Sequence, residues 1–335
     1  MKTLLIVGAG GFIGGFIAEK GLEAGYDVWV TVRESTSRKY LTDPRLKFIV
    51  LDYEDENQVK EALEKERPGE NGWEYIVYNL GATKAPDFQT FNKVNFQYLR
   101  SFATALNLAG CHPKVFLYMS SLSVMGEGDE KNYTPFSTSM AANPNTKYGL
   151  SKIKSEQWLE SQSGLPWIIF RPTGVYGPHE KDYLMMIKSI DSHFDFGVGF
   201  KKQMLTFIYV EDLVDAIYKA LYHPDKTVHH RYIISEDRSY TQKEFRKIVA
   251  EALGKKFVVP VRLPLWATWL ASYVAEKTAG LRGKTSTLNR DKFRIMRQRN
   301  WNADISPAKE DFGFSPKHSL KDGIARTVEA YLAGK

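Results

Sequence analysis

A tyrosine and a lysine four positions apart, Tyr148 and Lys152, are the side chains in this sequence best suited to proton transfer. In a helix, residues at this spacing share one face and lie roughly 6 Å apart along the axis. A phenol with a pKa near ~10 is a poor acid–base catalyst at neutral pH, but a nearby positive charge favours the phenolate. We therefore expect Tyr148 to transfer a proton and Lys152 to lower the pKa of its phenol. The same spacing also arises by chance on ordinary amphipathic helices.

Ser121 is a third candidate for the same chemistry. It follows an apolar stretch, residues 115–119, that has the composition of a buried strand. Parallel sheets bind ligands at the carboxyl ends of their strands, so a hydroxyl there could donate a hydrogen bond to a substrate oxygen. Ser123 lies close enough along the chain to contact the same substrate.

The glycine-rich segment at residues 8–14 follows a short apolar strand and opens a helix. Glycines at such a turn let the backbone approach a pyrophosphate, which the helix N-terminus stabilises with its free N–H groups and its dipole. The segment predicts a dinucleotide-binding turn, and a merely tight structural turn is the alternative. The residues expected at the pyrophosphate are Gly8, Gly11, Phe12, Ile13 and Gly14.

The residue that ends the second strand distinguishes the two nicotinamide dinucleotides. An acidic residue there binds the ribose 2′-hydroxyl of NAD, whereas an arginine accommodates the 2′-phosphate of NADP. This strand ends in Arg33, with Arg38 shortly after it, so the sequence favours NADP. NAD stays open because Glu34 follows directly. Asp52 and Tyr53, after the third strand, are expected to meet the adenine.

Strand-like and helix-like segments alternate through the first half of the chain with short connections, which is the pattern of a parallel doubly wound sheet. We therefore predict an α/β fold, a Rossmann-type doubly wound parallel sheet with a smaller interleaved C-terminal substrate lobe. Strands are expected at residues 4–7, 28–32, 47–51, 75–79, 115–120, 167–171, 204–210 and 231–235. Helices are expected at residues 12–25, 57–66, 91–109, 148–161, 210–221 and 241–253.

Two interleaved units are expected because no repeat or low-complexity linker divides the 335 residues. The NAD(P)-binding domain is predicted at residues 1–172 and about 204–232, and the substrate lobe at residues 173–203 and 233–335. These boundaries follow the loosening of the alternating pattern after Pro172.

Composition narrows the class of protein. A hydrophobic share of 43% with 25% charged residues is ordinary for a globular chain. The single cysteine, Cys111, excludes a disulfide framework within the chain and a multi-cysteine metal site, and it suits a cytoplasmic protein. The N-terminal apolar run is too short for a signal peptide, and no stretch approaches the ~20 apolar residues of a membrane span. No metal is expected.

The net charge of +7 is concentrated in part at residues 282–299, which hold seven Lys and Arg against Asp291. A run of this kind is usually a solvated face. No recognised nucleic-acid-binding module accompanies it, so a nucleic-acid partner is not expected. The expected partner is a small-molecule substrate, while a peripheral membrane contact and a homodimer stay open.

Taken in order, these motifs resemble the extended short-chain dehydrogenases/reductases, the NAD-dependent epimerase/dehydratase family, over nearly the whole chain. The segments at residues 171–178 and 304–316 are similar to its 3β-hydroxysteroid dehydrogenase and dihydroflavonol reductase branches. The other matching segments are the three glycines at 8, 11 and 14, residues 79–82, 120–121 and 207–212, and the tyrosine–lysine pair.

The resemblance implies further roles. Ser121 corresponds to the catalytic serine of the family, and Lys152 would also hold the nicotinamide ribose. Asn95 matches a family asparagine that we interpret as a helix-positioning group. The chain departs from the family where Met125 replaces a tyrosine and Asn79 a histidine. By the same resemblance, Pro172 and Thr173 would lie near the carboxamide of the cofactor. Leu80, Gly81 and Ala82 would lie beneath its adenosine.

The substrate end differs from nucleotide-sugar members of the family. Those members usually carry an asparagine where this chain has Gly174, and residues 203–206 supply no arginine for a diphosphate. Lys84 could reach the substrate, although a surface lysine is the plainer interpretation.

An apolar helix is expected within residues 263–281. Its apolar side, which includes Trp266 and Trp269, could face the core, form a lid over an apolar substrate, or rest on a membrane surface.

The leading hypothesis is an NADP-dependent oxidoreductase that interconverts a ketone and a secondary alcohol on a bulky, largely apolar substrate of hydroxysteroid or flavonoid type. A nucleotide-sugar epimerase or dehydratase with tightly held NAD is the first alternative. A non-catalytic dinucleotide-binding regulator of the same fold is the second.

Overall fold

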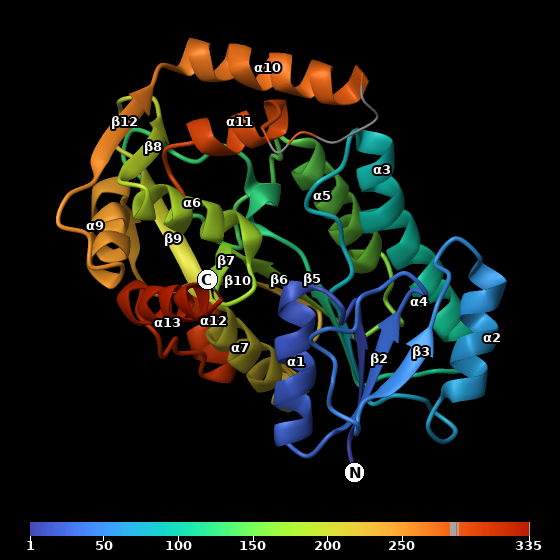
Figure 1. The fold of residues 1–335 in the computed structure, drawn as a ribbon. Coiled ribbons are helices and arrows are strands. Elements are labelled where there is room, and N and C mark those ends of the chain that lie inside the picture. The colour runs from blue at the N-terminus through green and yellow to red at the C-terminus, as the bar shows by residue number, and fades with distance from the viewer. Residues whose placement is uncertain (282–285, 287, 335) are drawn as a thin grey trace.

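A parallel sheet of seven strands forms the centre of the molecule (Figure 1). The computed structural model describes residues 1–281, 286 and 288–334. Across the sheet the order is β10-β6-β5-β4-β1-β2-β3, so the chain starts in the middle and winds outward in both directions. This confirms the predicted doubly wound α/β fold. Its strands are β1 (Thr3–Val7), β2 (Asp27–Val32), β3 (Lys47–Val50), β4 (Tyr75–Tyr78), β5 (Val115–Met119), β6 (Trp167–Pro172) and β10 (His230–Ile234).

Helices cover both faces of this sheet because its strands are apolar on both sides. In β1, Leu4 and Ile6 join the core on one face, whereas Leu5 and Val7 join the core on the other. The first face is covered by α1 (Phe12–Glu23), α7 (Val210–Tyr222), α8 (Pro224–Thr227) and α12 (Ser306–Phe312). The second face is covered by α2 (Glu56–Glu66), α4 (Tyr98–Leu108) and α5 (Lys147–Glu160).

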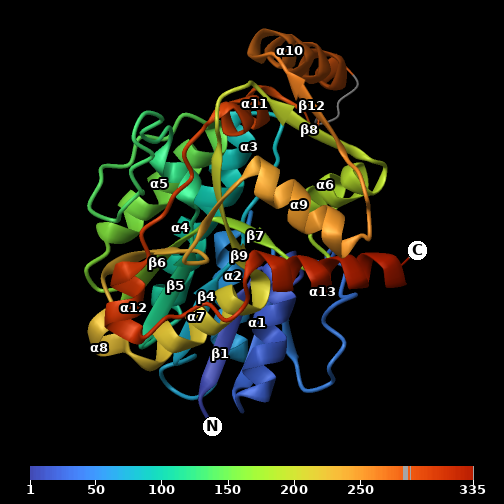
Figure 2. The ribbon, with the colours of Figure 1, turned by 90° about the vertical axis from the view of Figure 1, so that its left-hand side faces the viewer.

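The remaining elements form a second region beyond the carboxyl ends of the strands (Figure 2). It contains a three-stranded sheet, β11 (Ser239–Thr241), β9 (Met204–Tyr209) and β7 (Gly174–Tyr176), and a two-stranded sheet, β12 (Val259–Leu263) and β8 (Phe194–Val198). Its helices are α6 (Lys181–Asp191), α9 (Gln242–Ala252), α10 (Leu265–Leu281), α11 (Arg290–Arg297) and α13 (Leu320–Ala333). Since β10 returns to the large sheet between β9 and β11, the two regions interleave; the domain boundaries stay a prediction.

The expected elements lie within a few residues of those observed. The predicted helix at residues 12–25 ends earlier, because Gly25 has a positive φ of 77° that stops a helix. The helix predicted at residues 91–109 is three elements: α3 (Phe88–Asn92), a π-helical turn (Lys93–Gln97) and α4.

The apolar side of α10 does not face the core, so the core-facing interpretation is wrong. Trp266 is 71% exposed and Trp269 is 47% exposed. The basic run that follows lies partly in α11, while Arg282 and Lys284 lie outside the described residues.

Membrane-spanning and metal-binding features are absent from the described part of the chain. None of its helices combines the length and apolar character needed to cross a bilayer. Within the same residues no group of three or more His, Cys, Asp or Glu side chains is placed to hold a metal ion. Cys111 is buried as a free thiol.

Candidate active site

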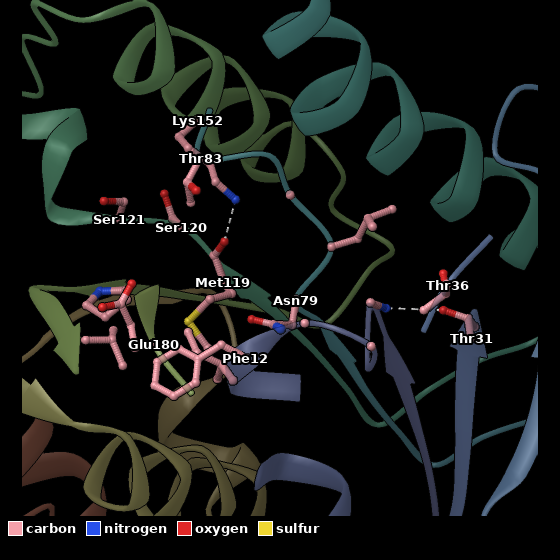
Figure 3. Close-up of a pocket in the computed structure, with 18 of the residues that line it drawn as sticks. Phe12, Thr31, Thr36, Asn79, Thr83, Met119, Ser120, Ser121, Lys152 and Glu180 are labelled. Carbon is pink, nitrogen blue, oxygen red and sulfur yellow. Dashed lines mark hydrogen bonds between the residues drawn. The ribbon is translucent and has the colours of Figure 1, made fainter. Parts of the chain in front are cut away.

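A cavity of about 680 Å³ opens at the carboxyl ends of the central strands (Figure 3). Segments that follow β1, β2, β4, β5 and β6 all contribute to its wall. In a parallel sheet all these strand ends lie on one edge, so residues far apart in sequence meet there. Sequence-predicted residues in the wall are Gly8, Gly11, Phe12, Ile13, Arg33, Tyr53, Leu80, Gly81, Ser121, Tyr148, Lys152, Pro172 and Thr173.

The glycine turn at one end of the cavity has no room for side chains at two of its positions. A Cβ at Gly8 would lie 2.7 Å from the backbone of Leu80, and one at Gly14 would lie 2.6 Å from Cα of Ala9. At Gly11, by contrast, a Cβ would meet only the Gly8 carbonyl oxygen, at 3.6 Å. Gly11 is also the N-cap of α1 and provides no side-chain cap, so the first N–H groups of α1 are available to an anion.

Thr31 and Tyr53 support this turn from below. The Thr31 hydroxyl accepts a hydrogen bond from the Gly8 N–H at 3.3 Å and shares a second one, of 2.7 Å, with the Tyr53 hydroxyl. Burial raises the pKa of the Tyr53 phenol. Asp52 is not in the cavity wall, and its carboxylate accepts a hydrogen bond from the Glu54 N–H at 3.0 Å.

The loop after β2 forms the wall beside the expected adenosine ribose. Exposed Arg33 lies in the wall, whereas Glu34 does not. Arg38 also lies outside it, because its guanidinium packs 4.5 Å from the centre of the Phe48 ring. Ser35 of this loop also lines the cavity, as do Thr36 and Ser37, which sequence reasoning missed although the clustering of hydroxyl residues after the strand was a usable signal.

Tyr148 and Ser121 face the opposite end of the cavity. Tyr148 lies in the first turn of α5, whose N-cap Thr146 accepts a hydrogen bond from the Gly149 N–H at 3.0 Å. Burial raises the pKa of the Tyr148 phenol to about 12, and its hydrogen bond with Ser121 opposes that rise. The Ser121 hydroxyl accepts hydrogen bonds from the Ser123 N–H at 3.2 Å and the Ser123 hydroxyl at 3.0 Å. Ser123 therefore orients Ser121 and is not itself in the cavity wall.

Lys152 is buried one turn further along α5 and has a lowered pKa. Its ammonium Nζ donates a hydrogen bond to the Met119 carbonyl oxygen at 2.7 Å (Figure 3). Burial lowers the pKa of the amine to about 7, while the negative charge of Glu156 acts in the opposite direction. The side chain thus titrates near neutral pH with its nitrogen held at the cavity wall.

Glu156 and Arg171 form an ion pair beneath the site that sequence reasoning did not identify. Neither side chain is exposed, and the Arg171 Nη2 donates to Glu156 Oε2 at 2.5 Å. The Ser120 hydroxyl donates to the same carboxylate, and Arg171 Nη1 contacts the Met125 sulfur at 3.2 Å. The usable signal was the spacing, because Glu156 continues the four-residue step from Tyr148 through Lys152.

Asn95 links the loop after β4 to α5 through hydrogen bonds. Its side-chain amide accepts from the Ala82 N–H at 2.7 Å and donates to the Ser151 hydroxyl at 2.8 Å. Its backbone carbonyl accepts from the Ser155 hydroxyl at 2.8 Å. Asn95 lies in the π-helical turn, a feature that often occurs at functional sites. Ala82 itself is fixed by this link and does not line the cavity.

Comparison with known proteins agrees with this arrangement. Residues 4–235, more than half of the chain, match the NAD-dependent epimerase/dehydratase family. The chain belongs to this family.

Its relatives have more than one activity. A UDP-glucose 4-epimerase of Vibrio cholerae is 27% identical, with 99% of this chain and 96% of the relative covered. A 3β-hydroxysteroid-dehydrogenase/decarboxylase (isoform 3) of Arabidopsis thaliana is 22% identical, with 98% of this chain and 61% of the relative covered. A solved UDP-glucose 4-epimerase of Thermotoga maritima, with UDP-glucose, superposes with a TM-score of 0.78 at 22% identity and 99% coverage of both chains. These comparisons show the fold and the family and leave the substrate open.

The cavity of this epimerase/dehydratase family member fits a nicotinamide dinucleotide. The Thr173 hydroxyl lies in the cavity wall and is buried without a hydrogen-bond partner among the described residues. Because Gly11 has no Cβ, space is free beside the N-terminus of α1, which has no side-chain cap. A bound dinucleotide would give the Thr173 hydroxyl a hydrogen-bond partner and would place its pyrophosphate at the N-terminus of α1.

The residues predicted to contact substrate are spread more widely than the cofactor residues. Lys84 forms a 2.6 Å ion pair with Asp182 of α6, which also binds Lys292 of α11 at 3.2 Å. Trp266 and Trp269 are outside the cavity wall, on the exposed side of α10. Neither Lys84 nor the two tryptophans line the cavity.

The space next to Gly174 is occupied by an aromatic side chain, that of Tyr183. A Cβ at this position would lie 1.9 Å from the hydroxyl oxygen of Tyr183. Tyr183 packs edge-on against Tyr176 and Phe207, which fixes its ring. The space beside Gly174 is therefore filled by the protein's own phenol.

Proposed function

We propose that this protein is an NADP-dependent oxidoreductase that interconverts a ketone and a secondary alcohol on a bulky, largely apolar substrate of hydroxysteroid or flavonoid type. The observation that carries the proposal is the meeting of Tyr148, Lys152 and Ser121 at one end of the cavity, opposite the glycine turn. The dinucleotide, when bound, supplies or accepts a hydride.

The protein's own residues handle the proton in this proposal. The Ser121 hydroxyl hydrogen-bonds the substrate oxygen and orients it toward the phenol. Tyr148, with a pKa of about 12, is protonated at neutral pH and can donate its proton to that oxygen during reduction. For oxidation the phenol must lose its proton first, and a positive charge on Lys152 stabilises the phenolate. Glu156 supports this charge, because its carboxylate raises the pKa of Lys152.

Arg33 supports NADP over NAD. It is the charged residue of the β2 loop that lines the cavity, and it is accompanied there by the hydroxyls of Ser35, Thr36 and Ser37. A guanidinium with neighbouring hydroxyl groups can bind the 2′-phosphate of NADP. Glu34, the carboxylate that could bind the ribose 2′-hydroxyl of NAD, does not line the cavity.

Two features support an apolar substrate. Tyr183 fills the space beside Gly174, from which a longer polar side chain could otherwise reach a sugar nucleotide. Gln203 is engaged elsewhere, since its amide donates to the carbonyls of Met296 and Gln298 at 3.2 and 2.6 Å. The similarity over 98% of this chain to a plant hydroxysteroid dehydrogenase/decarboxylase supports the same class.

A nucleotide-sugar epimerase or dehydratase with tightly held NAD is the second candidate. The similarity to the Vibrio cholerae UDP-glucose 4-epimerase, which spans nearly both chains, favours it. Such an enzyme would retain NAD through its cycle and release no reduced cofactor.

The test is NADPH oxidation by the purified protein with ketones of steroid, flavonoid and UDP-sugar type. We expect turnover with an apolar polycyclic ketone, and a loss of several orders of magnitude in Tyr148→Phe with NADPH affinity retained. Tyr222→Phe makes the same change on a half-exposed tyrosine of α7 and should retain parent activity. Thermal stabilisation by UDP-glucose alone, with no response to the apolar ketones, would replace the proposal by the epimerase.

The cofactor preference has its own test. Arg33→Ala should weaken NADPH binding and leave NADH binding nearly unchanged in titration calorimetry. Arg38→Ala removes an arginine five positions later that packs on Phe48 outside the cavity, so it should change neither affinity. Equal affinities of the parent protein for NADPH and NADH would contradict the NADP assignment.

A further inference from the structure

The helix α10 is oriented with its apolar side outward. Large apolar side chains on this side are between 37% and 71% exposed: Leu265, Trp266, Trp269, Leu270, Tyr273 and Val274. Its protein-facing side is small and polar, with Thr268 and Ser272 buried there. Within the described part of the chain, these two hydroxyls donate to backbone carbonyls close by: Thr268 to that of Pro264, just before the helix, at 3.2 Å, and Ser272 to that of Thr268 at 2.7 Å. A helix in water that is stabilised by burial of its apolar side would have the opposite orientation.

The exposed apolar surface continues from α10 onto the two-stranded sheet. Leu263 ends β12 and is separated from α10 by Pro264, and the chain that leaves β8 leads to Phe200, which is 77% exposed. A Cβ at Gly199 would lie 3.5 Å from Leu265 Cδ2, so the segment with Phe200 lies beside the start of α10. The same sheet exposes four more apolar side chains at its surface or just before it: Phe194, Phe196, Phe257 and Val259.

Strand alternation places the apolar side chains of the two strands together. Phe194 is in register with Val259, and Phe196 with Val261, so these four strand residues point to one side of the sheet. The acid of β8, Asp195, points to the other side, where it is buried against Arg262 at 3.0 Å. One side of this small sheet is thus apolar and the other holds its ion pair.

Positive charges border this surface. Lys201 and Lys202 follow Phe200, Lys256 precedes Phe257, and all three are exposed. On α10, Lys277 lies 5.9 Å from the centre of the Tyr273 ring. In residues 199–203 and 255–278 the one acid is Glu276, which is paired with Arg290 at 3.0 Å.

From this combination we infer that the outer surface of α10 and the β8–β12 sheet docks on an anionic phospholipid membrane. Aromatic and aliphatic side chains would enter the region between headgroups and acyl chains, while the lysines at the border bind the lipid phosphates. The position of α10 agrees with this, because it projects from the body of the molecule with α11 beneath it (Figures 1 and 2).

Two other occupants fit the surface less well. A second copy of the chain packed on the same surface would bring the two positive borders together, which is repulsive. A substrate would be held in the cavity of the proposed function, and no described side chain of α10 lines that cavity. An anionic bilayer would bury the apolar side chains and also pair with the positive charges that border them.

The experiment is flotation of the full chain with vesicles of phosphatidylcholine alone and of phosphatidylcholine mixed with phosphatidylglycerol. We expect binding to the anionic vesicles that weakens at high ionic strength, and quenching of tryptophan fluorescence by brominated acyl chains. Trp266→Glu/Trp269→Glu should lower the bound fraction roughly tenfold or more. Lys201→Glu/Lys277→Glu should weaken binding to the anionic vesicles alone.

A matched control separates the surface from a general effect of added charge. Leu108→Glu/Leu332→Glu places the same acid at two exposed apolar positions on α4 and α13, and should bind vesicles as the parent does. Melting temperatures of all three variants should stay near the parent value, because the substituted side chains are exposed. The inference is overturned if the parent chain does not float with anionic vesicles, or if the double tryptophan variant floats equally well. A parent dimer that the tryptophan substitutions dissociate, without any vesicle binding, would assign the surface to a second copy instead.

Discussion

Replacing Glu156 by glutamine should destabilise the protein substantially, although the side chain itself neither lines the cavity nor reaches solvent. Glu156 and Arg171 are both fully buried, and glutamine would leave the arginine charge without its partner. Breaking a buried ion pair from one side costs about 3–5 kcal/mol, because the remaining charge keeps its desolvation penalty. With about 2.1 cal/mol/K of unfolding entropy per residue, a chain of 335 residues loses roughly 4–7 °C in melting temperature.

Differential scanning calorimetry of Glu156→Gln measures this loss, and Glu160→Gln is the matched control. Glu160 lies one turn further along α5 and pairs with Arg231 at 3.3 Å, but the side chains of both Glu160 and Arg231 are partly exposed. A surface pair of this kind contributes about 0–1 kcal/mol, so the control should lower the melting temperature by at most about 1–2 °C. Equal shifts in the two variants would refute the reasoning about burial.

A double replacement tests the cause of that loss. Glu156→Met/Arg171→Met removes both charges and should recover much of the stability lost in Glu156→Gln, since apolar side chains of similar size need no partner. If the double variant is less stable than the single one, the hydrogen bonds to Ser120 and Met125 matter more than the charge.

Three further predictions follow from the geometry. The pKa of Lys152 is about 7 in the folded protein and higher in the unfolded chain, so above pH 7 the unfolded chain binds a proton that the folded one has lost. Stability should therefore rise with pH between about 7 and 9, by up to about 1.4 kcal/mol per pH unit, and urea unfolding of Lys152→Met should show a flatter dependence. Gly14→Ala should lower the melting temperature because its Cβ would lie 2.6 Å from the Ala9 backbone, whereas Gly11→Ala should keep the melting temperature and weaken dinucleotide binding in calorimetry. Trp269→Ala should change the melting temperature by less than about 1 °C, since surface substitutions usually fall within ±0.5 kcal/mol; a loss of several degrees would show that its ring is packed.

The sequence alone predicted the strands of the large sheet because their signals are local. Each is a short apolar run, and the turn at residues 8–14 carries glycines at two positions, 8 and 14, where the structure leaves no room for a Cβ. Tyr148 and Lys152 were found for the same reason, since a four-residue step defines a helix face before any packing is known. Ser121 was found because a strand end can be located from its apolar run.

Pairing between distant segments was beyond the sequence. In the sequence, Glu156 is one acidic residue among others in a polar helix. It pairs with Arg171 only because the sheet places β6 next to α5. Arg33 and Arg38 look alike in the sequence, and only the packing of Arg38 on Phe48 separates them. The apolar side of residues 265–274 was visible as a pattern, but periodicity defines a side of a helix without stating what that side faces. Tertiary structure decided this, because Thr268 and Ser272 are the residues that pack inward and the tryptophans point out.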